Sequence, residues 1–188
     1  MPSSICVYCG SSPGSQPIYA EATKSLAEVL VQRGIRLVYG GASVGTMGLL
    51  ADHVLALGGE AVGVIPESLQ AKEIAHPGLT ELHVTDSMHS RKARMAELSE
   101  GFIALPGGLG TLDELFEIWT WGQLGFHSWP IGLLNVDGYY DHLIGFLDHA
   151  VEQGFVKPHH RSMIQVASSA DLLVDTLASY SAPSTPKL

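Results

Sequence analysis

Short apolar runs along this chain alternate with longer segments in which apolar residues recur at helical spacing. Continuous apolar runs are typical of strands that helices cover on both faces. The runs predict about seven strands, at residues 5–8, 36–39, 61–65, 82–84, 101–105, 130–134 and 163–166. The helical spacing predicts helices at residues 19–33, 46–57, 86–98, 115–124, 139–153 and 170–180.

This alternation predicts an α/β fold: a Rossmann-like, doubly wound, mainly parallel sheet of about seven strands with helices on both faces. No internal repeat interrupts the pattern, so we expect one domain over residues 1–180. Residues 181–188 are polar, contain two prolines and are predicted to form a disordered tail. In an open parallel sheet, the loops that follow strands share the carboxyl edge, where ligands bind.

Three glycine-rich loops follow predicted strands, at residues 9–12, 40–46 and 106–111. Glycine lets the backbone approach a ligand closely, and the first N–H groups of a following helix are free to bind an anion. The stretch 106–114, Pro-Gly-Gly-Leu-Gly-Thr-Leu-Asp-Glu, is the best candidate. No loop has the lysine of a P-loop or the spacing of a dinucleotide fingerprint, which disfavours NAD. The loops together favour a mononucleotide or sugar phosphate.

The net charge of −9 argues against general affinity for nucleic acid or anionic membranes. Three of the ten basic residues nevertheless cluster, at Arg91, Lys92 and Arg94. No apolar run is long enough to span a membrane, and the first residues lack a secretory signal, so we expect a cytoplasmic protein. A hydrophobic content of 46% suggests that some surface is buried in an oligomer.

Cys6 and Cys9 have the spacing of a redox motif, but Cys6 lies in the first predicted strand rather than at a helix start. Packing roles in the core and at the strand end are the favoured interpretation. The nine histidines show no strong metal-binding spacing, and a solvated loop explains His159 and His160 better than a metal pair. We therefore expect no metal and no cofactor.

Two motifs resemble those of one known family. Residues 106–114 match the pattern P-G-G-x-G-T-x-x-E, and residues 88–92, Met-His-Ser-Arg-Lys, match M-H-x-R-K. Both resemble the LOG (LONELY GUY) family of cytokinin riboside 5′-monophosphate phosphoribohydrolases, also labelled lysine decarboxylase-like. The similarity extends from Cys6 to about Leu177.

The resemblance implies hydrolysis of the N-glycosidic bond of adenosine 5′-monophosphate or its N6-substituted forms, releasing a free base and ribose 5-phosphate. It implies a homodimer with the site near the subunit interface. It assigns Arg91 and Glu114 as the catalytic pair. Together with the loop chemistry, it predicts substrate contacts by Ser11, Gly41, Thr46, Glu73, Met88, Lys92, Gly107, Gly108, Leu109, Gly110, Thr111, Leu112 and Asp113.

Several of these residues also have purely structural interpretations. Thr111 and Glu114 have the spacing of a capping box, which would close a helix without catalysis. Arg91 could be a solvated helix charge, a clamp on the phosphate or a proton donor to the leaving base; an unperturbed arginine is a poor acid, so a clamp with electrostatic positioning is preferred. Lys92 could bind phosphate or form a surface salt bridge. Glu73 alone would be a surface charge. A non-catalytic carrier of a phosphorylated ligand, such as molybdenum cofactor, is the alternative to an enzyme.

Overall fold

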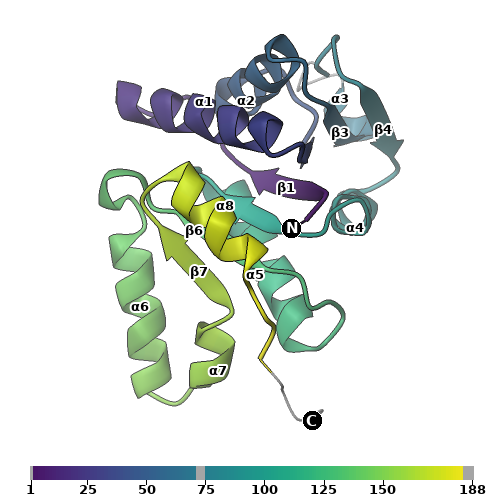
Figure 1. Cartoon of the computed structure of the whole chain (residues 1–188). Helices are drawn as coiled ribbons and strands as arrows, with labels where there is room; N and C mark the ends of the chain where they lie inside the picture. The colour runs from purple at the N-terminus through teal and green to yellow at the C-terminus, as the bar shows by residue number, and fades with distance from the viewer. Residues whose placement is uncertain (1, 71–74, 184–188) are drawn as a thin grey trace.

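The computed structural model of the chain describes residues 2–70 and 75–183, and a single seven-stranded sheet organises them. Every pairing in the sheet is parallel, in the order β4-β3-β2-β1-β5-β6-β7. Figure 1 shows β4 and β7 toward opposite ends of the molecule, with β1 between them. The strands are β1 Ser4–Tyr8, β2 Arg36–Tyr39, β3 Ala61–Pro66, β4 Glu81–Thr85, β5 Phe102–Ala104, β6 Ile131–Leu134 and β7 Ile164–Ala167.

Helices cover both faces of the sheet, and alternate residues of each central strand face the two layers. In β1, Ile5 and Val7 belong to one buried cluster with residues of α1, α2 and α8, whereas Cys6 and Tyr8 belong to a second cluster with residues of α4, α5 and α6. The predicted doubly wound fold is therefore confirmed. The helices are α1 Pro17–Gln32, α2 Gly45–Ala56, α3 Glu67–Gln70, α4 Met88–Glu97, α5 Leu109–Gln123, η1 Val136–Gly138, α6 Asp141–Glu152, α7 Pro158–Arg161 and α8 Ala170–Ala178.

The largest difference from the predicted elements lies at the start of α5. The helix begins at Leu109, not at residue 115, and Gly108 is its N-cap with extended backbone angles. The sequence pattern assigned the glycine-rich stretch to a loop, because glycine disfavours helix interiors. The structure instead uses Gly110 inside the first turn. Short helices α3 and α7 were not predicted, and residues 181–183 of the predicted tail have no regular structure.

Strand order reverses between β1 and β5, which are neighbours in the sheet. The chain proceeds outward from β1 to β4 on one side, and from β5 to β7 on the other. Such a reversal splays the loops that follow the two strands and opens a crevice between them. The loops after β1 and β5 are two of the three predicted glycine-rich loops, so the topology fixes where a ligand would bind.

Candidate active site

A cavity of about 180 Å³ lies at the carboxyl ends of β1 and β5. The two loops touch behind it, since a side-chain carbon added to Gly10 would lie 3.6 Å from the Cα of Gly107. The cavity is lined by Cys9, Gly10, Ser11, Met47, Met88, Arg91, Gly108, Leu109, Gly110, Thr111, Asp113 and Glu114.

The N-terminus of α5 forms one wall of the cavity. The first intrahelical bond runs from the Leu112 N–H to the Gly108 carbonyl, so the N–H groups of the preceding helical residues have no acceptor within the helix. The Thr111 hydroxyl is buried and, within the described part of the chain, has no hydrogen-bond partner. It packs against Gly107, where a Cβ would lie 2.1 Å from Thr111 Oγ1. Unused donors at a helix start form an anion-binding site.

Arg91 comes from the first turn of α4 and forms the opposite wall. Ser87 caps this helix by accepting a hydrogen bond from the Ser90 N–H, with a reciprocal bond from the Ser87 N–H to Ser90. The Arg91 guanidinium is buried: Nε donates to the Val64 carbonyl and Nη2 to the Gly40 carbonyl, both at 3.0 Å. The ends of β3 and β2 thus hold it from behind, and Nη1 is the nitrogen directed to Glu114.

The Arg91 and Glu114 side chains meet across the cavity. Nη1 of Arg91 lies 3.9 Å from Oε1 of Glu114, and the two side chains are 7% and 12% exposed. The two carbonyl bonds use two of the five N–H donors of the guanidinium and fix its plane, which leaves Nη1 as the nitrogen that faces Glu114. This arrangement favours electrostatic positioning as the role of Arg91. Thr111 is the third residue of α5 rather than its cap, so the capping-box explanation of Glu114 does not apply.

The titratable side chains of β1 and of Cys9, which follows it, are uncharged at neutral pH. Burial is the main cause that raises the pKa of the Cys6, Tyr8 and Cys9 side chains, and the charge of Glu114 raises these pKa values further. For Tyr8 the neighbouring Cys6 has a larger effect than Glu114. Both cysteines are free and buried, as the packing interpretation predicts. The charges that face the cavity are therefore those of Arg91 and Glu114, with Asp113 at the rim.

Five predicted contacts lie away from the cavity wall, and one of them is Gly107, which packs against Thr111. Thr46 is buried and its hydroxyl bonds both the N–H and the carbonyl of Gly10, so it holds the first loop. Gly41 packs against β3, with a positive φ of 79°. Leu112 packs against the second core cluster. Lys92 forms ion pairs with Asp113 and Glu117 of α5.

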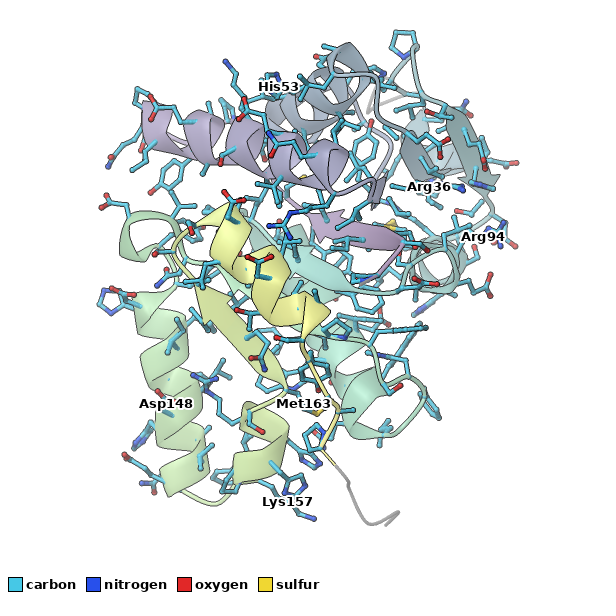
Figure 2. The ribbon with its side chains drawn as sticks, viewed as in Figure 1. Arg36, His53, Arg94, Asp148, Lys157 and Met163 are labelled. Atoms are coloured by element: carbon cyan, nitrogen blue, oxygen red, sulfur yellow. The ribbon has the colours of Figure 1, made fainter. Side chains whose placement is uncertain are left out.

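Glu73 lies outside the described residues. The residues from 75 onward pair with the second glycine-rich loop, because Ala75 bridges to Ala42 and the His76 N–H donates to the Gly41 carbonyl at 3.0 Å. Arg94, one turn beyond Arg91, pairs with Glu97 at 3.1 Å, and Figure 2 places it at the periphery of the molecule. It does not support Arg91 directly.

Sequence reasoning missed residues that reach the site from unexpected places. Cys9, Gly10 and Met47 line the cavity. The first two directly follow β1, so the topology rule could have identified them. Two tyrosines from the loop after β6 also hold the glycine loop: the Tyr139 hydroxyl donates to the Gly107 carbonyl and the Tyr140 hydroxyl to the Leu105 carbonyl, each at 2.6 Å. No spacing in the sequence indicates these bonds.

Among residues 2–70 and 75–183, no three His, Cys, Asp or Glu side chains are grouped so that they could hold a metal ion. No helix in the same residues is both long and apolar enough to cross a membrane.

The fold and site define a Rossmann-like α/β protein with a cavity at its switch point, lined by the N-terminus of α5. Solved structures share this fold at low identity. The molybdenum cofactor binding protein of Rippkaea orientalis superposes with a TM-score of 0.68, at 21% identity over 94% of this chain and 95% of that one. The molybdenum cofactor carrier protein of Chlamydomonas reinhardtii gives 0.69, at 18% identity over 94% and 98%.

Sequence comparisons are more specific. Residues 47–177 match the family described as "Possible lysine decarboxylase". The chain is 51% identical over 175 residues to the probable cytokinin riboside 5′-monophosphate phosphoribohydrolase LOGL3 of Oryza sativa subsp. japonica, covering 93% of this chain and 83% of that one. Against LOG1 of Arabidopsis thaliana, a cytokinin riboside 5′-monophosphate phosphoribohydrolase, identity is 51% over 176 residues, covering 94% and 83%. The chain belongs to this phosphoribohydrolase family, and the predicted resemblance is confirmed.

Proposed function

We propose that this chain hydrolyses the N-glycosidic bond of adenosine 5′-monophosphate or its N6-substituted forms, with Arg91 and Glu114 as the catalytic pair. One observation carries the proposal. A buried arginine and a carboxylate, 3.9 Å apart, face a cavity whose other wall is a helix N-terminus. A nucleoside monophosphate presents the matching groups, a phosphate for the helix and a ribose for the carboxylate.

The chemistry fits a single carboxylate. As the bond between ribose C1′ and the base nitrogen breaks, its electron pair leaves with the base and positive charge develops on the ribose. The Glu114 anion stabilises that charge more in the transition state than in the ground state, which accelerates the step. Water supplies the hydroxyl that forms the new bond at C1′, and its proton balances the departing base. The products are free base and ribose 5-phosphate.

We assign the phosphate to the donors at the start of α5, with Ser11 beside them on the first loop. Arg91 holds Glu114 in place through Nη1 and contributes a fixed positive charge. Met88, whose sulfur lies 3.8 Å from Arg91 Nη1, and Leu109 supply apolar surface for the base. Gly107 shapes the loop without lining this cavity.

A non-catalytic carrier remains the second candidate, since proteins of that kind share the fold. The likeness concerns the backbone alone at these identities. The buried Arg91 and Glu114 pair favours the enzyme, because a carrier has no use for a carboxylate beneath a ribose. A carrier would retain a nucleotide intact, whereas the proposed enzyme releases its base.

We further propose that the chain acts as one domain over residues 1–180 and forms a homodimer in the cytoplasm, without nucleic-acid or membrane partners. Large apolar side chains exposed after α5 support the dimer: Leu124 and Trp129 are about half exposed and Phe126 is 73% exposed. Light scattering on the purified chain tests it, with twice the chain mass of 20.0 kDa as the expected result.

The activity is tested by incubating the protein with AMP and N6-isopentenyl-AMP and measuring released base by chromatography. The matched nucleosides, which lack phosphate, are the controls. We expect release from the nucleotides and little from the nucleosides. Comparable base release from nucleotides and nucleosides would show that phosphate recognition has no part in the reaction. Intact nucleotide bound to the protein would favour the carrier.

A further inference from the structure

We infer that Lys92 is a positioning residue that neutralises the carboxylates flanking Glu114 and thereby keeps Glu114 ionised. The inference rests on the proposed function, in which the Glu114 anion is the active form. Lys92 then contributes to the reaction although it does not line the cavity.

The contacts of Lys92 connect α4 to the same face of α5 that carries Glu114. Its Nζ lies 3.0 Å from Asp113 Oδ2 and 2.7 Å from Glu117 Oε2. The Lys92 side chain is 13% exposed and that of Glu117 is 25% exposed, so water screens this pair less than it screens an ordinary surface pair. The ion pairs with Glu117 and Asp113 outweigh the effect of burial and raise the pKa of Lys92.

Asp113, Glu114 and Glu117 fall within five consecutive residues of α5. Glu114 and Glu117 are three residues apart, which places them one turn apart on a helix, and Asp113 precedes Glu114 directly. Lys92, Glu114 and Glu117 also border the same small gap, together with Tyr8. Repulsion between like charges at this spacing favours the protonated form of one of them.

Groups from α4 and from the region of β1 also face Glu114. From α4, Arg91 faces Glu114 at 3.9 Å. From β1 and the residue that follows it, the Cys6, Tyr8 and Cys9 side chains stay neutral because their pKa values are raised. Lys92 is thus the cation that offsets Glu117 and Asp113, while Arg91 serves Glu114 itself.

A purely structural ion pair between two helices is the competing explanation. It would stabilise the packing of α4 on α5 without changing the protonation of Glu114. The two explanations differ in how activity depends on pH, and in whether removing Glu117 reverses the loss of Lys92.

The test uses Lys92→Met, which keeps the apolar stem, Glu117→Gln, and the double variant. Arg94→Met is the matched control, because it removes a cation from the same helix at its pair with Glu97. The pH profile of kcat/KM for AMP is measured for each folded variant. In Lys92→Met the acid limb moves up by about one pH unit, and in Glu117→Gln it moves down. The double variant returns toward wild type and Arg94→Met stays there.

A second readout does not need activity. The Glu114 carboxyl is followed by carbon-13 NMR titration, with its signal assigned by its loss in Glu114→Gln. We expect its midpoint to rise in Lys92→Met by the same amount as the acid limb. An unchanged midpoint, or a loss of activity that Glu117→Gln does not reverse, overturns the inference. If the midpoint moves as expected while no nucleotide is hydrolysed, the proposed function fails and the role of Lys92 in ionising Glu114 stands.

Discussion

Substitutions at two adjacent tyrosines can separate an effect on substrate binding, through the position of the glycine loop, from an effect on the stability of the fold. Tyr139 and Tyr140 each donate one hydrogen bond of 2.6 Å to the glycine loop, to the carbonyls of Gly107 and Leu105. Tyr139 is 43% exposed, whereas Tyr140 is 2% exposed. Replacing either one by phenylalanine removes only the hydroxyl. We predict that Tyr140→Phe mainly lowers the stability of the fold, whereas Tyr139→Phe mainly weakens the binding of AMP.

Tyr140→Phe leaves the buried Leu105 carbonyl without this partner, which costs about 1–3 kcal/mol of unfolding free energy. Each kcal/mol lowers Tm by about 2–4 °C in a domain of this size. Tyr139→Phe costs less because water can replace the lost bond. It loosens Gly107, next to the phosphate site, so we expect KM for AMP to rise roughly three- to tenfold with kcat almost unchanged, the pattern of lost uniform binding.

Steady-state kinetics and thermal unfolding of both variants, with inhibition by ribose 5-phosphate as a direct measure of phosphate binding, complete the experiment. The two substitutions control for each other because they make the same chemical change one residue apart. An unchanged KM and inhibition constant in Tyr139→Phe would refute the loop-positioning role. An unchanged Tm in Tyr140→Phe would refute the argument from burial.

Further predictions concern the glycine loop, the thiols and the cap of α4. Gly107→Ala places a Cβ 2.1 Å from Thr111 Oγ1, so we expect a loss of about 1–3 kcal/mol in stability by denaturant titration and a raised KM. Because burial raises the pKa of Cys6 and Cys9, a thiol reagent should leave both unmodified at neutral pH until the protein is denatured; rapid labelling of the native protein would contradict this. Ser87→Ala should cost about 1 kcal/mol by the same titration, and a smaller loss than in an exposed Ser→Ala control would show that the cap is dispensable.

Much of the fold was predictable because its signals are local. Continuous apolar runs identified the strands, and the helical spacing located the main helices within a few residues. The residue pair Asp137 and Gly138 also indicates a turn after the sixth strand, and both residues have positive φ there. The start of α5 was not predictable in this way, since Gly108 and Gly110 indicate a loop by propensity and the tertiary structure overrides them.

The site was predictable to the extent that topology brings loops together. Ser11, Gly108 and Thr111 reach one cavity because β1 and β5 are neighbours at the reversal of strand order. The roles of Thr46 and Lys92 were not predictable, because a hydroxyl or an ammonium can face a ligand or a neighbouring segment with the same spacing. Only the three-dimensional contacts with Gly10 and with α5 decide between these possibilities.

The central claim is that Glu114 acts on the ribose rather than on the fold. The most direct measurement is base release from AMP by Glu114→Gln, a nearly isosteric change, with Glu97→Gln as the control at an exposed carboxylate. The account predicts that kcat falls about 100- to 1000-fold in Glu114→Gln, with AMP binding and Tm retained, while the control behaves as wild type. A Glu114→Gln enzyme that releases base within about threefold of the wild-type rate would contradict it.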